Sequence, residues 1–169
     1  MQKVKIKTLN AAAFAPFGEV IESAGAEYHL INDGRFERYH ALSKVDLNAS
    51  DDTYPIISLF KCARATSLPY TLKLMEKHPV GSQAFMPLNN IPFVIAVAKS
   101  DAAMKRQEIY AFKSNGNQGI NLSRGIWHMP LIAPGEGLEF LVVDREGPGT
   151  NCIEMPVDPP VQICPEGRE

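Results

Sequence analysis

The chain is organised around residues 72–88, LKLMEKHPVGSQAFMPL, which bring a carboxylate, an imidazole and an amide into one short stretch. Side chains of a β-strand alternate between its two faces, so Glu76 and His78 share the face of Leu74. Two lysines mark the opposite face, which includes Met75, as the solvated one. A buried charge without a partner is costly, so a carboxylate and an imidazole on the apolar face indicate a ligand or a catalytic role.

Turn residues divide the rest of the chain into short strands. The Asp33-Gly34 step predicts a hairpin, because glycine adopts a positive φ without steric cost. Residues 93–98, FVIAVA, are typical of a strand buried on both faces. Asn10 can cap a short helical turn over residues 11–15, and residues 102–107 have a helix-forming composition. About eight or more short strands with little helix predict an all-β antiparallel sandwich or small barrel.

Length and composition indicate one domain, residues 1–169, in which 45% of the residues are hydrophobic. The formal net charge is −2 without a basic block, so we expect a small-molecule partner, no nucleic acid and no membrane. The first residues alternate charged and apolar types, unlike a signal peptide, and no apolar run approaches the roughly 20 residues of a membrane helix. From about residue 156, four prolines and a charged end predict an extended tail.

The cysteines Cys62, Cys152 and Cys164 are odd in number and form no C-x-x-C pair. That pattern argues against a disulfide framework or a zinc ribbon and fits the reducing cytoplasm. The chain contains neither a P-loop nor a G-x-G-x-x-G motif, so we expect no organic cofactor. Ser82 lacks the G-x-S-x-G context of a hydrolase nucleophile, so we expect it to contact substrate and not to attack it.

A second motif lies at residues 119–131, GINLSRGIWHMPL, and contains His128. Together with residues 76–88, it resembles the ureidoglycolate lyase family of allantoin degradation, long called ureidoglycolate hydrolases. Residues 10–22 and 31–40 are similar to that family's N-terminal segments, so the resemblance extends to about Asp144. It implies a cupin-like double-sheet jelly-roll barrel with a few short helices, a homodimer, and cleavage of (S)-ureidoglycolate to glyoxylate and urea.

The resemblance also brings in the general cupin signature, in which a His-x-His, a following Glu and a later His bind a metal. Here Glu76, His78 and Gln83 stand at the first positions and His128 at the last, so two of the four ligands have changed. Imidazole and carboxylate suit a divalent ion, with Ni²⁺ as our first choice and Mn²⁺ or Zn²⁺ as alternatives, but an amide oxygen is a weak ligand. We therefore expect metal to bind loosely or not at all.

Three residues are the candidate catalytic groups: His128, Glu76 and His78. Ureidoglycolate is a carbinol-urea, so its cleavage needs a base for the hydroxyl proton and an acid for the departing nitrogen. An imidazole can take either part, and burial can shift the pKa of a carboxyl or an imidazole toward neutrality. A lone Glu-x-His is more often a structural ion pair, and a lone His128 is as often a satisfied core histidine. The two motifs together favour catalysis.

The candidate substrate-binding residues share an ability to grip a carboxylate or a urea: Arg38, Lys61, His40, Gln83 and Ser82. Arg38 offers a bidentate fork for a carboxylate, whereas His40 is about as consistent with a solvated hairpin position. Gln83 can hydrogen-bond either the urea or the carboxylate. Two rival interpretations stay open, namely another metal-dependent cupin enzyme, an isomerase or oxygenase acting on a small hydroxy acid, and a non-catalytic protein that binds a small acid.

Overall fold

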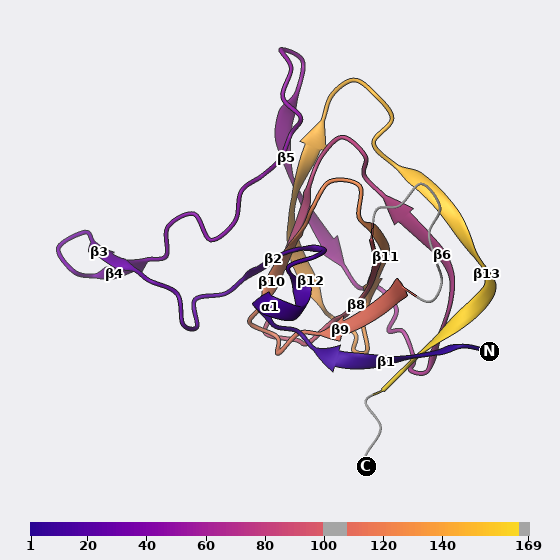
Figure 1. The fold of residues 1–169 in the computed structure, drawn as a ribbon. Helices are drawn as coiled ribbons and strands as arrows, with labels where there is room; N and C mark the ends of the chain where they lie inside the picture. The colour runs from indigo at the N-terminus through magenta and orange to yellow at the C-terminus, as the bar shows by residue number, and fades with distance from the viewer. Residues whose placement is uncertain (100–107, 166–169) are drawn as a thin grey trace.

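Figure 1 shows the computed structural model, which describes residues 1–99 and 108–165. This part of the chain is almost entirely β-structure, as the sequence predicts, and its architecture matches a cupin-like jelly roll. One sheet closes into a barrel in the order β1 (Lys3–Thr8), β13 (Ile153–Cys164), β6 (Tyr70–Lys77), β11 (Trp127–Ile132), β8 (Val94–Ala98) and β9 (Ile109–Lys113). The second sheet has the order β2 (Gly18–Ile21), β10 (Gly119–Leu122), β7 (Gln83–Pro87), β12 (Glu139–Glu146) and β5 (Tyr54–Lys61).

Helix is scarce in the described residues. The helix α1 (Ala11–Phe14) begins at the expected cap, where the Asn10 side chain accepts a hydrogen bond from the Ala13 amide at 2.9 Å. The helix-forming segment 102–107 lies outside the described residues. No helix in the described part of the chain is long and apolar enough to cross a membrane.

Two hydrophobic cores flank the barrel sheet. One fills the space between the two sheets, with Ile95 of β8 packed among residues such as Phe85 of β7 and Phe140 of β12. The other fills the barrel interior, where Ala96 of β8 lies with Leu72 of β6 and neighbours from four further strands. Because β8 contributes alternate residues to both cores, it is buried on both faces, as its continuous apolar sequence predicts.

The predicted faces of β6 are only partly right. Met75, expected on the wet face, is fully buried in the barrel core, while Leu74 on the expected inner face is 44% exposed. The second core covers the Met75 side of β6, which an antiparallel sandwich would leave to solvent, whereas Leu74 belongs to neither core. A register shift in the pairing of β6 with β13 falls between Leu72 and Leu74, where the inward alternation changes phase.

The segment expected to be an extended tail from about residue 156 instead completes the barrel, so this prediction was wrong. Residues 153–164 form β13, which pairs antiparallel with β6 and parallel with β1. The two prolines Pro159 and Pro160 fall within the register shift, where a missing N–H breaks no ladder hydrogen bond. Buried residues at alternate positions anchor the strand beyond them: Val161 and Ile163.

The predicted hairpin is present as β3 (His29–Ile31) and β4 (Phe36–Arg38). Its turn uses positive φ angles at three successive residues, Asn32, Asp33 and Gly34, which are residue types that tolerate the left-handed region. Figure 1 shows the hairpin projecting away from the barrel on a long connection. Large apolar side chains are exposed in both strands, Leu30 in β3 and Phe36 in β4, and Tyr28 is exposed just before β3.

Candidate active site

A carboxylate and an imidazole meet on adjacent strands of the barrel. Glu76 of β6 is in register with His128 of β11, and the His128 Nε2 lies 3.4 Å from the Glu76 Oε1. The His128 side chain is 1% exposed, while that of Glu76 is 20% exposed and lines a cavity. Strand pairing therefore fixes the contact, with the imidazole buried and the carboxylate at the cavity wall.

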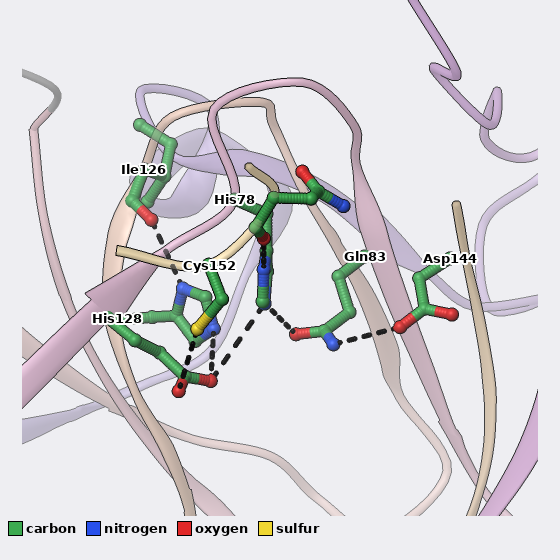
Figure 2. Close-up of polar contacts among 8 residues, drawn as sticks. His78, Gln83, Ile126, His128, Asp144 and Cys152 are labelled. Carbon is green, nitrogen blue, oxygen red and sulfur yellow. Dashed lines mark hydrogen bonds and ion pairs between the residues drawn. The ribbon is translucent and has the colours of Figure 1, made fainter. Parts of the chain in front are cut away.

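His78 follows the end of β6 and contacts the same oxygen of Glu76 as His128 does. Its Nε2 lies 3.8 Å from the Glu76 Oε1 and 3.1 Å from the Gln83 Oε1. The rings of His78 and His128 are 5.1 Å apart between centroids. Figure 2 shows His78 between His128 and Gln83, so the two sequence motifs converge on one point.

The outer nitrogens of both imidazoles face backbone carbonyls. The His78 Nδ1 lies 2.5 Å from the Asn151 carbonyl oxygen, and the His128 Nδ1 lies 3.1 Å from that of Ile126. A carbonyl only accepts, so each Nδ1 carries hydrogen and each Nε2 turns inward toward Glu76. This tautomer, held by an outer hydrogen bond, is the one found in histidines that bind a metal through Nε2.

The side chains of Glu76, His78 and His128 suit a divalent cation as ligands. One ligand atom from each of Glu76, His78 and His128 lies within 4.8 Å of the other two. Within the described residues, the buried His128 Nε2 has no hydrogen-bond partner, and the Glu76 oxygen at 3.4 Å is a long contact for it. The Gln83 Oε1 adds a weaker donor beside His78, so all four residues of the expected metal set come together.

The two imidazoles control the charge of Glu76. The contact with the His128 imidazole at 3.4 Å lowers the pKa of Glu76 from its ordinary 4.5, although burial of the carboxyl group acts in the opposite direction. The charges of His128 and His78 lower this pKa further, so Glu76 is an anion at neutral pH. Cys152 lies beside it, with its Sγ 3.9 Å from the Glu76 Oε2, and burial and the Glu76 charge raise the pKa of this thiol above 9.0.

The site opens into a cavity of about 290 Å³ between the two sheets. Glu76 and Gln83 contribute polar groups to its wall, and Lys61 and Arg64 contribute cations. The remaining lining is mainly apolar, with Phe60, Cys62, Thr66, Phe85, Leu131, Ala133 and Phe140. A cavity of this size holds a small molecule.

The structure brings only some of the expected substrate-binding residues to this cavity. Gln83 lines it, and so does Lys61, whose ammonium is paired with Glu139 at 3.0 Å. The Ser82 hydroxyl instead accepts a hydrogen bond from the Asp46 amide at 2.8 Å and faces a different hollow. Arg38 and His40 belong to the projecting hairpin and its base, and neither lines the cavity of their own chain.

Three residues near the site were not found from the sequence: Arg64, Asp144 and Cys152. Asp144 could have been predicted from strand alternation, because it lies on the same face of β12 as Phe140 and Val142 and so points between the sheets. Its Oδ2 accepts a hydrogen bond from the Gln83 amide nitrogen at 3.2 Å. Arg64 and Cys152 follow strands in irregular segments. Arg64 reaches the cavity and Cys152 reaches Glu76 through long-range packing that no local sequence pattern predicts.

Comparison with known proteins places the chain in a family. The sequence signature described as ureidoglycolate lyase matches residues 1–164. The chain belongs to the ureidoglycolate lyase family. A protein of Azotobacter vinelandii named ureidoglycolate lyase is 48% identical over 154 residues, which cover 91% of this chain and 92% of that relative. Proteins of the same name from Stutzerimonas stutzeri and Pseudomonas aeruginosa are 46% and 44% identical over 91% of this chain and 89% and 90% of their own length. Membership of the ureidoglycolate lyase family confirms the resemblance seen in the two motifs.

Proposed function

We propose that this protein is a ureidoglycolate lyase, which cleaves (S)-ureidoglycolate to glyoxylate and urea in allantoin and purine catabolism. Family membership supports the activity, and the contact of Glu76 with two inward-facing imidazoles at a small cavity is the observation that carries the mechanism. The reaction belongs to the carbon–nitrogen lyases that release an amidine-type product. Residues 1–169 would act as one catalytic domain in the cytoplasm.

The reaction moves one proton from oxygen to nitrogen. The hydroxyl proton leaves, the C–O bond becomes the aldehyde C=O of glyoxylate, and the C–N bond breaks with its electron pair on nitrogen. That nitrogen takes up a proton to give neutral urea, so water is neither consumed nor released. A base and an acid close together are the chemical requirement.

The three central residues supply this base and acid. His78 and His128 flank the Glu76 carboxylate at 3.8 and 3.4 Å, so a proton received on one imidazole can be balanced by a proton given up from the other. The lowered pKa keeps Glu76 anionic, and an anion between them stabilises whichever imidazole is protonated. After one turnover the set holds the same number of protons, and transfer of one proton between the two imidazoles through Glu76 restores the starting state.

A divalent metal fits the same residues. Glu76, His78 and His128 would hold it, with Gln83 as a weak fourth ligand, and Ni²⁺ is our first choice before Mn²⁺ and Zn²⁺. When bound, such an ion polarises an oxygen of the substrate as a Lewis acid. A ring nitrogen that binds the ion cannot also exchange a proton, so the ion would replace part of the proton transfer assigned to His78 and His128.

Incubation of pure protein with racemic ureidoglycolate tests the proposal. Glyoxylate and urea should appear in equal amounts, and one enantiomer should be consumed preferentially. Ammonia released in place of urea would reject the lyase assignment. Tightly held iron at full occupancy together with no release of urea would favour another cupin enzyme, an isomerase or oxygenase. Binding of the acid without any turnover would favour a non-catalytic protein.

A further inference from the structure

The cations of the cavity differ in how far their charge is already neutralised. The Lys61 ammonium lies 3.0 Å from the Glu139 carboxylate. The exposed Arg64 guanidinium has no ion pair or hydrogen bond within residues 1–99 and 108–165. Arg64 is therefore the cavity cation that is free to receive an anion, and its planar fork matches a carboxylate.

The other polar part of the cavity wall presents acceptors. The Glu76 carboxylate is one, and the Gln83 Oε1 is the second. A carboxylate of the ligand placed here would lie against the charge of Glu76. The N–H groups of a urea, in contrast, are donors that match both oxygens.

Asp144 fixes which end of the Gln83 amide faces the site. The Asp144 carboxylate can only accept hydrogen bonds, and it accepts one from the Gln83 Nε2 at 3.2 Å. The amide nitrogen of Gln83 is therefore held away from His78, and its Oε1 faces the His78 ring. The Asp144 Oδ1 is buried without another partner among the described residues, so the contact with Gln83 is the one that accounts for this carboxylate. Without Asp144, the amide is free to rotate and offer a donor.

The geometry points to a fixed orientation of the substrate: its carboxylate binds Arg64, its ureido N–H groups bind Gln83 and Glu76, and Asp144 is the positioning residue that keeps Gln83 an acceptor. This inference rests on the proposed lyase activity. Gln83 then hydrogen-bonds the urea of the substrate and not its carboxylate. Arg64, and not Lys61, binds the carboxylate.

Two non-reacting ligands separate the two ends. Glycolate has the carboxylate and the hydroxyl but no urea, and N-carbamoylglycine is the substrate without its hydroxyl. Arg64→Ala should raise the Kd of both ligands, measured by calorimetry, by about ten- to a hundredfold, the range expected for loss of a charge-assisted hydrogen bond. It should raise KM for ureidoglycolate similarly with little change in kcat, and Arg64→Lys should recover part of the loss. Lys5→Ala removes a cation from the exposed side of β1 and should change neither Kd.

Asp144→Ala should raise the Kd of N-carbamoylglycine by about three- to tenfold, the range expected for loss of a neutral hydrogen bond, and leave the Kd of glycolate unchanged. Asp144→Asn should restore binding, because its amide oxygen can still accept from Gln83. A purely structural role would lower affinity for both ligands and the melting temperature together. If Asp144→Ala does not fold, Gln83→Leu must show the same selective loss, since it removes the acceptor directly.

Opposite results overturn the inference. Wild-type activity with an unchanged glycolate Kd in Arg64→Ala would remove the anion-binding role, and an equal loss of both ligands in Asp144→Ala or in Gln83→Leu would remove the orientation of the urea. A wild-type protein that neither cleaves ureidoglycolate nor binds either ligand would instead refute the proposed function itself. The two failures are distinguished because the second is seen without any substitution.

Discussion

At the scale of single residues, His128 should affect the rate far more than substrate affinity. Proton transfer from a positioned side chain contributes about 10²–10⁴-fold and is felt mainly in the transition state, so His128→Ala should lower kcat by that factor with little change in KM. Glu76→Gln should have a similar effect, because it removes the anion that stabilises a protonated imidazole. Steady-state kinetics, with circular dichroism to confirm folding, measures both.

The exposed His29 on the hairpin provides the matched control for an imidazole removed elsewhere. His29→Ala should keep the wild-type kcat. A folded His128→Ala enzyme with a near-normal kcat would take His128 out of the mechanism and leave the proton transfers to Glu76 and His78.

The lowered pKa of Glu76 predicts a pH dependence of stability. A carboxylate whose pKa is lower in the folded chain stabilises that state above its ordinary pKa of 4.5, and this contribution is lost as pH falls through the lowered folded value. The wild type should therefore be more stable than Glu76→Gln near pH 7, and the difference should shrink steadily below about pH 4.5. Urea denaturation of both proteins across this range measures it. A difference that grows on acidification would contradict the direction of the shift.

At the scale of strands and turns, local pattern gave most of the fold. The continuous apolar run became β8, the Asp33-Gly34 step became the hairpin turn, and Asn10 became a helix cap. Pattern failed where long-range packing overrode it. The second core buries Met75 on a face that alternation alone marks as wet, and prolines concealed β13 although Val161 and Ile163 alternate inward.

The site shows the same division. Glu76, His78, Gln83 and His128 were predicted because two motifs contain them. The pairing of β6 with β11 brings Glu76 to His128, and His78, just after β6, contacts Gln83 of β7. The expected anchor Arg38 is in the hairpin, while Arg64 reaches the cavity from a segment without periodicity. Functional residues on or next to strands can be predicted from their spacing in the sequence. Functional residues on loops depend on long-range contacts, which no local sequence pattern shows.

The inclusion of β13 in the barrel predicts that its inward residues stabilise the whole fold. Ile163 is fully buried in the barrel core, so Ile163→Ala should lower the free energy of unfolding by about 2–5 kcal/mol. Glu154→Ala, on an exposed position of the same strand, should change it by less than about 0.5 kcal/mol. Denaturant titration compares them. Equal stability of the two variants would mean that residues 156–164 behave as the loose tail that the sequence predicts.

At the scale of the whole molecule, the candidate metal site is an addition to a core that is already packed. Two of its candidate ligands, Glu76 and Gln83, line a cavity, and neither hydrophobic core includes any of the four. A chelator should therefore reduce activity while shifting the melting temperature little, and divalent ions should bind weakly or substoichiometrically. Metal analysis alongside thermal denaturation tests this. Unfolding on chelation would show that the ion is structural.

The projecting hairpin provides the argument for the expected homodimer. An isolated two-stranded hairpin is marginally stable in water, yet this one exposes Leu30 and Phe36, each at 60%. The edge strand β5 exposes Ile57 and Leu59, at 72% and 62%, so each chain offers a second apolar surface. Burial of these surfaces between two copies would cover both, and it would give Arg38 a place at the interface.

The combined substitution of Leu30→Ser and Phe36→Ser should convert a dimer into a folded monomer, because it removes apolar area from the hairpin without touching either hydrophobic core. Sedimentation velocity over a range of protein concentrations measures the association. Leu88→Ser, which alters another exposed leucine outside the hairpin and β5, should leave the dimer intact.

If the hairpin also delivers Arg38 to the partner, Arg38→Ala should raise KM while leaving kcat nearly unchanged. A wild-type chain that sediments as a monomer at every concentration would contradict the homodimer, and a variant that still dimerises would show that the hairpin does not hold it together.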